Sequence, residues 1–190
     1  TVITNKKDVT DENLKNINLP NSLTQIGKWA FSYCESLTFV CIPEGITEIY
    51  SCTFFACESL STVNLPTTLK IIGDNAFWGC AITEIDIYNV ETIKDGAFGG
   101  TNLKSIILGP NLSLIGNSAF YNCDELKTVY NLSSLEITLG STDNGYVAYY
   151  AKYIHNELPR EIALEKEVAY DATSDILELP ESVTVIYNEE

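Results

Sequence analysis

Basic residues are scarce in this sequence. Eleven Lys and Arg residues stand against 26 Asp and Glu residues, which gives a formal net charge of −15. A chain with this balance repels phosphate backbones and anionic lipid head groups. We therefore expect neither nucleic acid nor an anionic membrane surface as a partner.

Long apolar runs and a leader segment are also missing. The sequence has no run of about 18 apolar residues, and residues 1–20 do not contain a basic segment followed by an apolar one. We expect no membrane insertion by this segment. Methionine is absent even at position 1. We therefore expect a trimmed or mature chain, with any secretion signal or anchor lying upstream.

Signatures of catalysis and metal binding are absent as well. The GxSxG, HExxH, P-loop and GxGxxG motifs do not occur, and His155 is the single histidine. Six cysteines are too few for a small disulfide scaffold, and the spacing of Cys34 and Cys41 is not that of a CxxC zinc motif. We expect no catalytic, cofactor or metal site and a non-enzymatic protein. An enzyme with an unrecognised site is the alternative.

What the sequence does contain is an internal repeat. The pattern LxxIxLP recurs every 21–23 residues in the segments LKNINLP, LTFVCIP, LSTVNLP, ITEIDIY, LKSIILG and LKTVYNL, the first starting at Leu14 and the last at Leu126. Between these copies lies a second signature, in which an apolar residue and Ile-Gly or a similar pair precede Ala-Phe and Cys. Its most regular column is Phe31, Phe54, Phe77, Phe98 and Phe120. So short a period indicates a solenoid, because each unit can bury its apolar residues only by stacking on its neighbours.

Each part of the repeat predicts a local structure. LxxIxLP predicts a strand whose Ile and Leu point inward and whose intervening residue points outward, and the proline ends it. A second short extended piece precedes Gly27, Gly73 and Gly116, which we expect at a bend with positive φ. The Ala-Phe part is too short for a full helix, so we predict a helical or 3-10 turn that carries Phe into the core.

These repeats resemble the BspA-type leucine-rich repeat, found in surface proteins of mouth and gut bacteria and of some protozoan parasites. The shared pattern LPxSLxxIGxxAFxxCxxLxxVxLP covers about residues 14–130. The resemblance implies a right-handed, β-rich leucine-rich-repeat solenoid and a secreted or cell-surface protein that mediates adhesion. Some positions depart from the pattern: Thr101 replaces Cys, Tyr50 and Lys94 replace Gly, and Tyr88 and Gly109 replace Pro.

The ends of an open stack need covers. We predict an N-terminal edge in residues 1–13, with a lone strand at residues 2–4, and a solenoid of about five repeats in residues 14–130. Residues 131–156 are predicted as a C-terminal cap with a Tyr-rich helix, because Val147, Tyr150, Ala151 and Ile154 have helical spacing. Residues 157–190 are interpreted as an acidic β tail or a partial further repeat.

The cysteines share one structural interpretation. Cys34, Cys57, Cys80 and Cys123 occupy one repeat position, so they form an inward column of free thiols that act as small buried hydrophobes. Cys41 instead lies at an outward position of the strand, and we expect it to be exposed.

The outward side of the strands is the candidate functional surface. Most of its residues are polar, but apolar residues lie on both sides of an acidic centre. Such residues either bind a partner or strengthen the sheet through cross-strand pairs. The predicted ligand-binding residues are Phe39, Cys41, Asn64, Glu84, Asp86, Ile107 and Tyr130.

These observations favour a monomeric surface or secreted binding module. Its expected partner is a protein, such as a host extracellular protein, or a glycan. The alternative is a structural spacer that presents another domain of a larger surface protein.

Overall fold

The computed structural model describes residues 2–3 and 14–162. The chain forms two compact units, Thr1–Glu157 and Leu158–Glu190, and residues 158–162 are the described part of the second. Most of the predicted N-terminal edge and nearly all of the predicted tail therefore lie outside the described residues. The strands of the first unit are β1 (Val2–Ile3), β2 (Asn16–Asn18), β3 (Gln25–Ile26), β4 (Phe39–Cys41), β5 (Glu48–Ile49), β6 (Thr62–Asn64), β7 (Ile71–Ile72), β8 (Thr92–Ile93), β9 (Ser105–Leu108), β10 (Leu114–Ile115), β11 (Thr128–Asn131) and β12 (Tyr153–His155).

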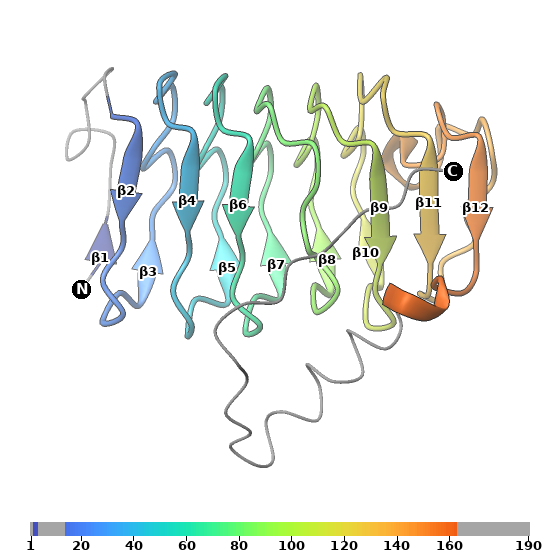
Figure 1. Ribbon diagram of the computed structural model, residues 1–190, viewed down its shortest axis with the longest axis horizontal. Helices are drawn as coiled ribbons and strands as arrows, with labels where there is room; N and C mark the ends of the chain where they lie inside the picture. Colours follow the sequence, from blue (N-terminus) through green and yellow to red (C-terminus); the bar gives the residue numbers. More distant parts are fainter. Residues whose placement is uncertain (1, 4–13, 163–190) are drawn as a thin grey trace, which may run out of the picture. The chain divides into compact units, whose positions relative to one another are not determined.

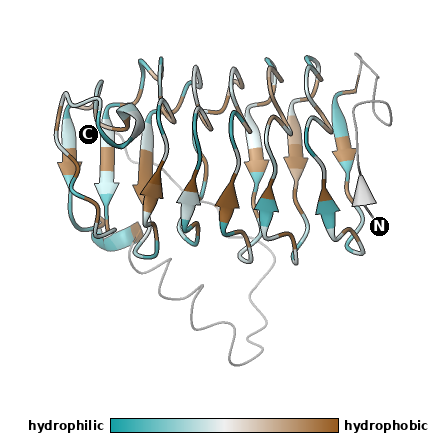
Figure 2. Ribbon diagram, turned by 180° about the vertical axis from the view of Figure 1, so that it is seen from behind, coloured by the Kyte–Doolittle hydropathy of each residue, from teal (hydrophilic) through white to brown (hydrophobic). Residues whose placement is uncertain are grey.

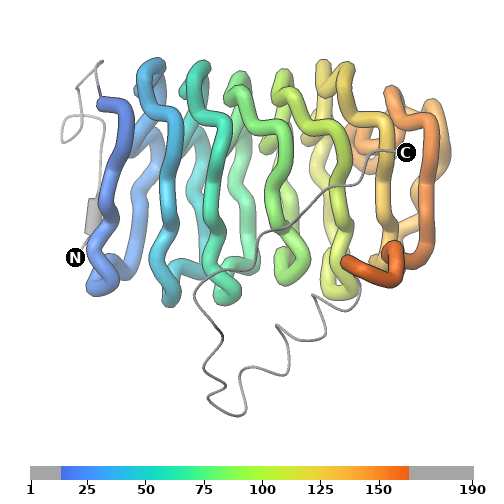
Figure 3. The backbone as a smooth tube through the Cα atoms, in the orientation of Figure 1, coloured from blue at the N-terminus to red at the C-terminus, as the bar shows by residue number. Residues whose placement is uncertain are grey.

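The first unit is a right-handed coil with strands on two sides. In Figure 1 the chain runs down through β2, crosses behind, runs up through β3 and continues into β4, one coil further along. The smooth tube in Figure 3 shows the same path repeated from coil to coil. All strand pairs in the described residues are parallel. The predicted right-handed solenoid is thereby confirmed.

We call the side that carries the longer strands the strand face. It contains two three-stranded sheets, in the orders β2-β4-β6 and β9-β11-β12, with residues 83–87 running between them. The rear side contains the four-stranded sheet β5-β7-β8-β10 and the pair β1-β3. The predicted strand near residues 2–4 is thus present as β1, which pairs with β3.

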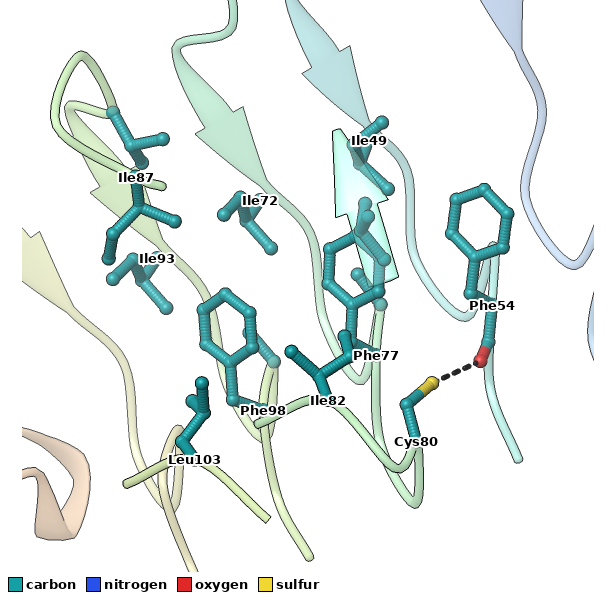
Figure 4. Packing of buried hydrophobic residues seen from close by; sticks show 14 of the residues in the cluster. Ile49, Phe54, Ile72, Phe77, Cys80, Ile82, Ile87, Ile93, Phe98 and Leu103 are labelled. Atoms are coloured by element: carbon teal, nitrogen blue, oxygen red, sulfur yellow. Dashed lines mark hydrogen bonds between the residues drawn. The ribbon is translucent and has the colours of Figure 1, made fainter. Parts of the chain in front are cut away.

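The core is a set of identical layers, one from each repeat. The five phenylalanines of the repeat column are fully buried and stack on one another. Ring centroids are 5.3 Å apart for Phe31 and Phe54, and 5.4 Å apart for Phe54 and Phe77, with nearly parallel planes. Isoleucines of the rear strands pack beside the rings, as Figure 4 shows for Ile49, Ile72 and Ile93. Stacking therefore buries the apolar residues that no single repeat could cover alone.

The segments around these phenylalanines, which we call the Phe turns, are residues 28–34, 51–57, 74–80, 95–101 and 117–123. In each Phe turn the residues two before and two after Phe have left-handed φ values, for example 53° at Asn75 and 72° at Gly79. In the first four Phe turns their N–H groups, and that of Phe itself, donate to the next repeat, whereas in the last turn the N–H of Phe120 donates to Gly145. Thus the N–H groups of Asn75, Phe77 and Gly79 each lie 2.8 Å from a carbonyl oxygen of the following turn.

The remaining N–H groups of a Phe turn bond within the turn. The N–H groups of Ala76, Trp78 and Cys80 donate to carbonyl oxygens three residues earlier, at 3.2–3.3 Å. This is the spacing of a 3-10 turn, but the left-handed residues prevent a continuous helix. The predicted short turn that carries Phe inward is therefore present, and every second N–H extends the ladder to the next repeat.

The glycines before the Phe turns have a different role from the one predicted. Neither Gly73 nor Gly116 has a positive φ. Instead, a Cβ on Gly73 would lie 2.7 Å from the Ile49 carbonyl oxygen of the preceding repeat, and one on Gly116 would lie 2.6 Å from the Asp95 backbone nitrogen. Both distances are too short for a side chain, so glycine is required for the close approach of neighbouring coils.

The cysteine column is confirmed. Cys34, Cys57, Cys80 and Cys123 are buried free thiols, whereas Cys41 is exposed. The Sγ atom of Cys57 donates to the Phe31 carbonyl oxygen at 3.0 Å, and that of Cys80 to the Phe54 oxygen at 3.1 Å. Figure 4 shows the second of these bonds. Burial raises the pKa of the Cys80 thiol well above its ordinary value, so this group stays protonated and remains a donor.

The predicted Tyr-rich helix within residues 131–156 is wrong. Residues 144–146 form one 3-10 turn, η2, and Tyr153–His155 form β12, which pairs with β11. The segment nevertheless covers the last Phe turn, because the Gly145 carbonyl oxygen accepts the N–H of Phe120 at 2.7 Å. An open parallel strand edge at β11 favours another strand over a helix, since unpaired backbone groups there gain partners.

The rear side has no uniform character along the coil. Figure 2 shows β7 and β10 as apolar, whereas hydrophilic colour appears in β3 and β5, which contain Gln25 and Glu48. Lys94, which replaces the repeat glycine, pairs with Glu48 at 3.2 Å, and Lys70 pairs with Glu91 at 3.0 Å. Leu114 on β10 is 53% exposed. Such isolated apolar residues are common on protein surfaces and do not mark a site by themselves.

Candidate binding surface

The strand face places the predicted residues outward. The central residues Val40 of β4 and Val63 of β6 are buried, those of the end strands β2 and β12 are partly buried, and the residues on either side point away from the core. Cys41, Asn64, Glu84 and Asp86 are exposed, whereas Phe39, Ile107 and Tyr130 are partly buried. The alternation therefore puts all seven predicted residues on one side of the coil.

The register divides these residues into separate groups. Cys41 lies opposite Asn64, while Phe39 lies opposite Thr62. Ile107 lies opposite Tyr130 on the other three-stranded sheet. Phe39 and Tyr130 are four coils apart, or about 19 Å at a strand spacing of about 4.8 Å. A single partner would have to span most of the face to contact both.

The apolar group at the C-terminal end is larger than the sequence indicated. Tyr130 lies opposite His155 of β12, and their rings stack with centroids 5.2 Å apart. The Tyr153 ring also stacks with His155, with centroids 6.3 Å apart. We call Ile107, Tyr130, Tyr153 and His155 the aromatic end of the strand face.

Tyr153 and His155 were missed because their segment was assigned to a helix. A signal was present in the sequence, since Ala151-Lys-Tyr-Ile-His matches Leu126-Lys-Thr-Val-Tyr with Lys and the inward apolar residue in the same places. The 25 residues between the two starts exceed the regular period, and the inserted residues hid the match.

The centre of the strand face is acidic, and its backbone does not form a regular strand. Glu84 and Asp86 lie in residues 83–87, which the structure shows as non-strand. The Asp86 carboxylate accepts the backbone N–H of Tyr88 at 3.0 Å, which fixes the end of this segment. The two carboxylates separate the aromatic end from the group around Phe39.

A pocket of about 40 Å³ lies where Asp86 and Tyr88 meet Leu65 and Pro66 of the preceding repeat. Pockets for small molecules usually have volumes of about 300–1,000 Å³. The pocket beside Asp86 is therefore too small to enclose such a molecule.

Residues 2–3 and 14–162 contain no group of three or more His, Cys, Asp or Glu side chains that could hold a metal ion. Within the same residues, no helix is both long and apolar enough to cross a bilayer.

Solved structures with similar folds are leucine-rich repeat proteins. The T. pallidum leucine-rich repeat protein aligns over 84% of both chains with a TM-score of 0.56 and 21% identity. A leucine-rich repeat protein from Bacteroides ovatus shares 22% identity over 62% of this chain and 55% of its own, with a TM-score of 0.38. A leucine-rich cell surface protein from Faecalibacterium prausnitzii shares 33% identity over 60% of this chain and 24% of its own, also with a TM-score of 0.38. This chain thus spans about half and a quarter of the last two proteins.

Comparisons of the sequence give a more direct result. No curated protein matches the chain. The family model described as "BspA type Leucine rich repeat region" matches residues 8–127 and 70–189, with six copies. Together these matches include all five Phe turns and every described strand from β2 to β12. The chain belongs to the BspA-type leucine-rich repeat family.

Proposed function

We propose that this chain is a non-enzymatic, protein-binding module that acts outside the cell or on its surface. The observation that carries the proposal is the aromatic end of the strand face. A surface that contacts only water is ordinarily polar and does not require aromatic rings at its outward positions. On this face, however, the rings of Tyr130, His155 and Tyr153 stack at those positions.

The composition of this group fits a protein partner. Aromatic residues with polar atoms are enriched at protein interfaces, because they bury a large apolar area and keep a hydrogen-bonding tip. The Tyr153 side chain is 58% exposed, so much of its ring is available for contact. The acidic centre at Glu84 and Asp86 would form the polar margin of the same interface and select partners by charge.

The extracellular location rests on the family. Membership of the BspA-type family implies a surface or secreted protein. A leucine-rich protein of Faecalibacterium prausnitzii is described as a cell surface protein. An adhesive role is the function that best combines this location with an exposed aromatic surface.

The test is a binding screen against immobilised, purified extracellular matrix and serum proteins. The wild type is compared with Tyr130→Ser/Tyr153→Ser and with Leu114→Ser, a matched loss of exposed apolar area on the rear side. We expect the strand-face variant to lose binding by at least about tenfold, since contacts at interface hot spots are worth about 2 kcal/mol or more. Equal loss in the Leu114 variant, or none in the strand-face variant, would reject this surface.

A further inference from the structure

A second group of exposed rings lies at the start of the coil, away from the strand face. Trp29 and Tyr33 come from the first Phe turn and are 45% and 46% exposed. Both rings contact Phe55 of the second Phe turn, with centroid distances of 5.9 Å for Trp29 and 5.4 Å for Tyr33. We call these three residues the aromatic corner.

The backbone of the aromatic corner is unfavourable for the residues it carries. Trp29 and Tyr33 have φ values of 63° and 59°, in the left-handed region where bulky side chains are rare. The equivalent positions of the other Phe turns hold no other aromatic residue: they are glycine or asparagine, which tolerate left-handed φ at lower cost, or the small residues Cys52, Ala56 and Ser118. Folding of the turn therefore does not call for aromatic residues here.

Burial does not account for these rings either. Nearly half of each side chain is exposed, so Trp29 and Tyr33 contribute less to the core than the fully buried Phe31 between them. Strained residues that gain little from packing tend to occur at functional sites. The two observations, backbone strain and exposure, are independent and both point to a ligand.

The charge around the Phe turns indicates the kind of ligand. In the five Phe turns and the two residues that follow each, Lys28 is the single cation. The acidic residues in the same segments are Glu35, Glu58, Asp74, Asp95, Asp124 and Glu125. Glu35 and Glu58 are exposed and follow the two Phe turns that form the aromatic corner.

We propose that the aromatic corner binds an arginine-containing, basic segment of a partner protein. A guanidinium group stacks on the faces of Trp, Tyr and Phe through cation–π attraction and also pairs with carboxylates in a fork geometry. The corner supplies rings from two repeats. The exposed residues Glu35 and Glu58 follow Tyr33 and Phe55 by two and three residues and supply the carboxylates. The net charge of −15 would draw such a segment toward the coil. This interaction does not depend on the strand face.

The experiment uses the full chain and a short synthetic peptide in which arginine alternates with glycine. A second peptide has citrulline, the neutral isostere, in place of arginine, and a neutral glucan oligosaccharide serves as a non-peptide probe. We expect the arginine peptide to bind at least about tenfold more tightly than the citrulline peptide. Binding should also weaken as salt rises from about 50 mM to about 300 mM, because the carboxylates are exposed.

The key variant is Trp29→Asn/Tyr33→Asn, which removes the rings and puts a tolerant residue at both left-handed positions. We expect the melting temperature to stay the same or rise, while affinity for the arginine peptide falls about tenfold through the loss of two exposed cation–π contacts. Glu35→Gln/Glu58→Gln should weaken binding and reduce its salt dependence. Tyr130→Ser/Tyr153→Ser should bind the peptide like the wild type, so this test can fail independently of the strand-face function.

Several outcomes would overturn the proposal. One is equal affinity of the Asn variant and the wild type, which would mean that diffuse negative charge alone attracts the peptide. Another is binding of the glucan but not of the arginine peptide, which would identify the corner as a sugar platform. A large fall in melting temperature of the Asn variant would refute the argument from strain.

Discussion

The Cys80 thiol lies 3.1 Å from the carbonyl oxygen of Phe54, one repeat earlier in the coil. Phe54 also receives the N–H of Cys57 in its own turn, at 3.3 Å. The same pattern recurs at Cys57 with Phe31 and at Cys123 with Phe98. The repeat cysteine is therefore both an apolar residue of the core and a hydrogen-bonding link between coils.

Replacing this thiol should weaken the stack. Cys80→Ala removes a buried sulfur and a weak hydrogen bond, and we expect a loss of about 1–2 kcal/mol in the free energy of unfolding, measured by urea denaturation. The control is Cys41→Ala, which removes an exposed thiol and should change stability by less than about 0.5 kcal/mol. Equal effects of the two changes would contradict the assigned role.

Stability should fall at alkaline pH. Burial raises the pKa of Cys80 and Cys123 above the ordinary value of 9.0, and for Cys123 the hydrogen bond with Thr101 partly opposes the rise. Because these folded-state pKa values exceed the unfolded ones, the stability linked to them is complete below about pH 9. It is lost as pH rises from there through the folded pKa values. Melting temperatures at about pH 8 and about pH 10.5 should show this loss, and Cys80→Ala/Cys123→Ala should reduce it.

Position in the phenylalanine stack should set the effect of a substitution. Phe77 has stacked neighbours on both sides, at 5.4 Å and 5.6 Å, whereas Phe31 has one among the described residues. Phe77→Ala should destabilise the coil by about 3–5 kcal/mol. Phe31→Ala should cost less by about 0.5–1.5 kcal/mol, the contribution of one aromatic pair. Urea denaturation of both variants measures the two losses in free energy of unfolding. A larger loss for Phe31→Ala would show that the number of stacked neighbours does not determine the size of the effect.

Gly109 should not tolerate a side chain. A Cβ there would lie 1.8 Å from the Tyr88 carbonyl oxygen, so the neighbouring coil would have to move. We expect Gly109→Ala to cost about 3 kcal/mol. At Gly140, with φ of 72° and open space around it, asparagine should be accepted with little change. Thermal unfolding of the two variants tests this difference, which would vanish if the coils could separate freely at Gly109.

Much of the coil could be predicted because equivalent positions of the repeats have the same environment, so the same kind of residue recurs at each of them. Five aligned phenylalanines and the column that includes Cys57 and Cys80 require a buried layer, and the alternation in LTFVCIP places Phe39 and Cys41 outward. Positions that vary between repeats carried less information. The left-handed residues of the Phe turns hold Trp29 in one repeat, Asn75 in another and Gly96 in a third. Only the comparison of the whole column indicates a conformation that suits Asn and Gly.

The C-terminal segment shows where periodicity misleads. Val147, Tyr150, Ala151 and Ile154 satisfy the helical period, but the backbone edge of β11 is open and a strand at Tyr153–His155 satisfies it. The spacing of apolar residues within this segment gives no information about its pairing partner β11, which lies 25 residues earlier. The same error concealed the aromatic end of the strand face, because Tyr153 and His155 face outward only when their segment is extended.

The division of N–H groups in the Phe turns also bears on how this molecule can change in length. Three N–H groups of each of the first four Phe turns donate forward, so a repeat presents N–H groups to the next repeat and the matching carbonyl oxygens to the preceding one. Duplication of one complete repeat would preserve every such bond, whereas insertion of a few residues within a Phe turn would break the ladder on both sides. Gene duplication can therefore extend the coil in whole units, and each added unit would bring new outward residues to both faces without a redesign of the interior.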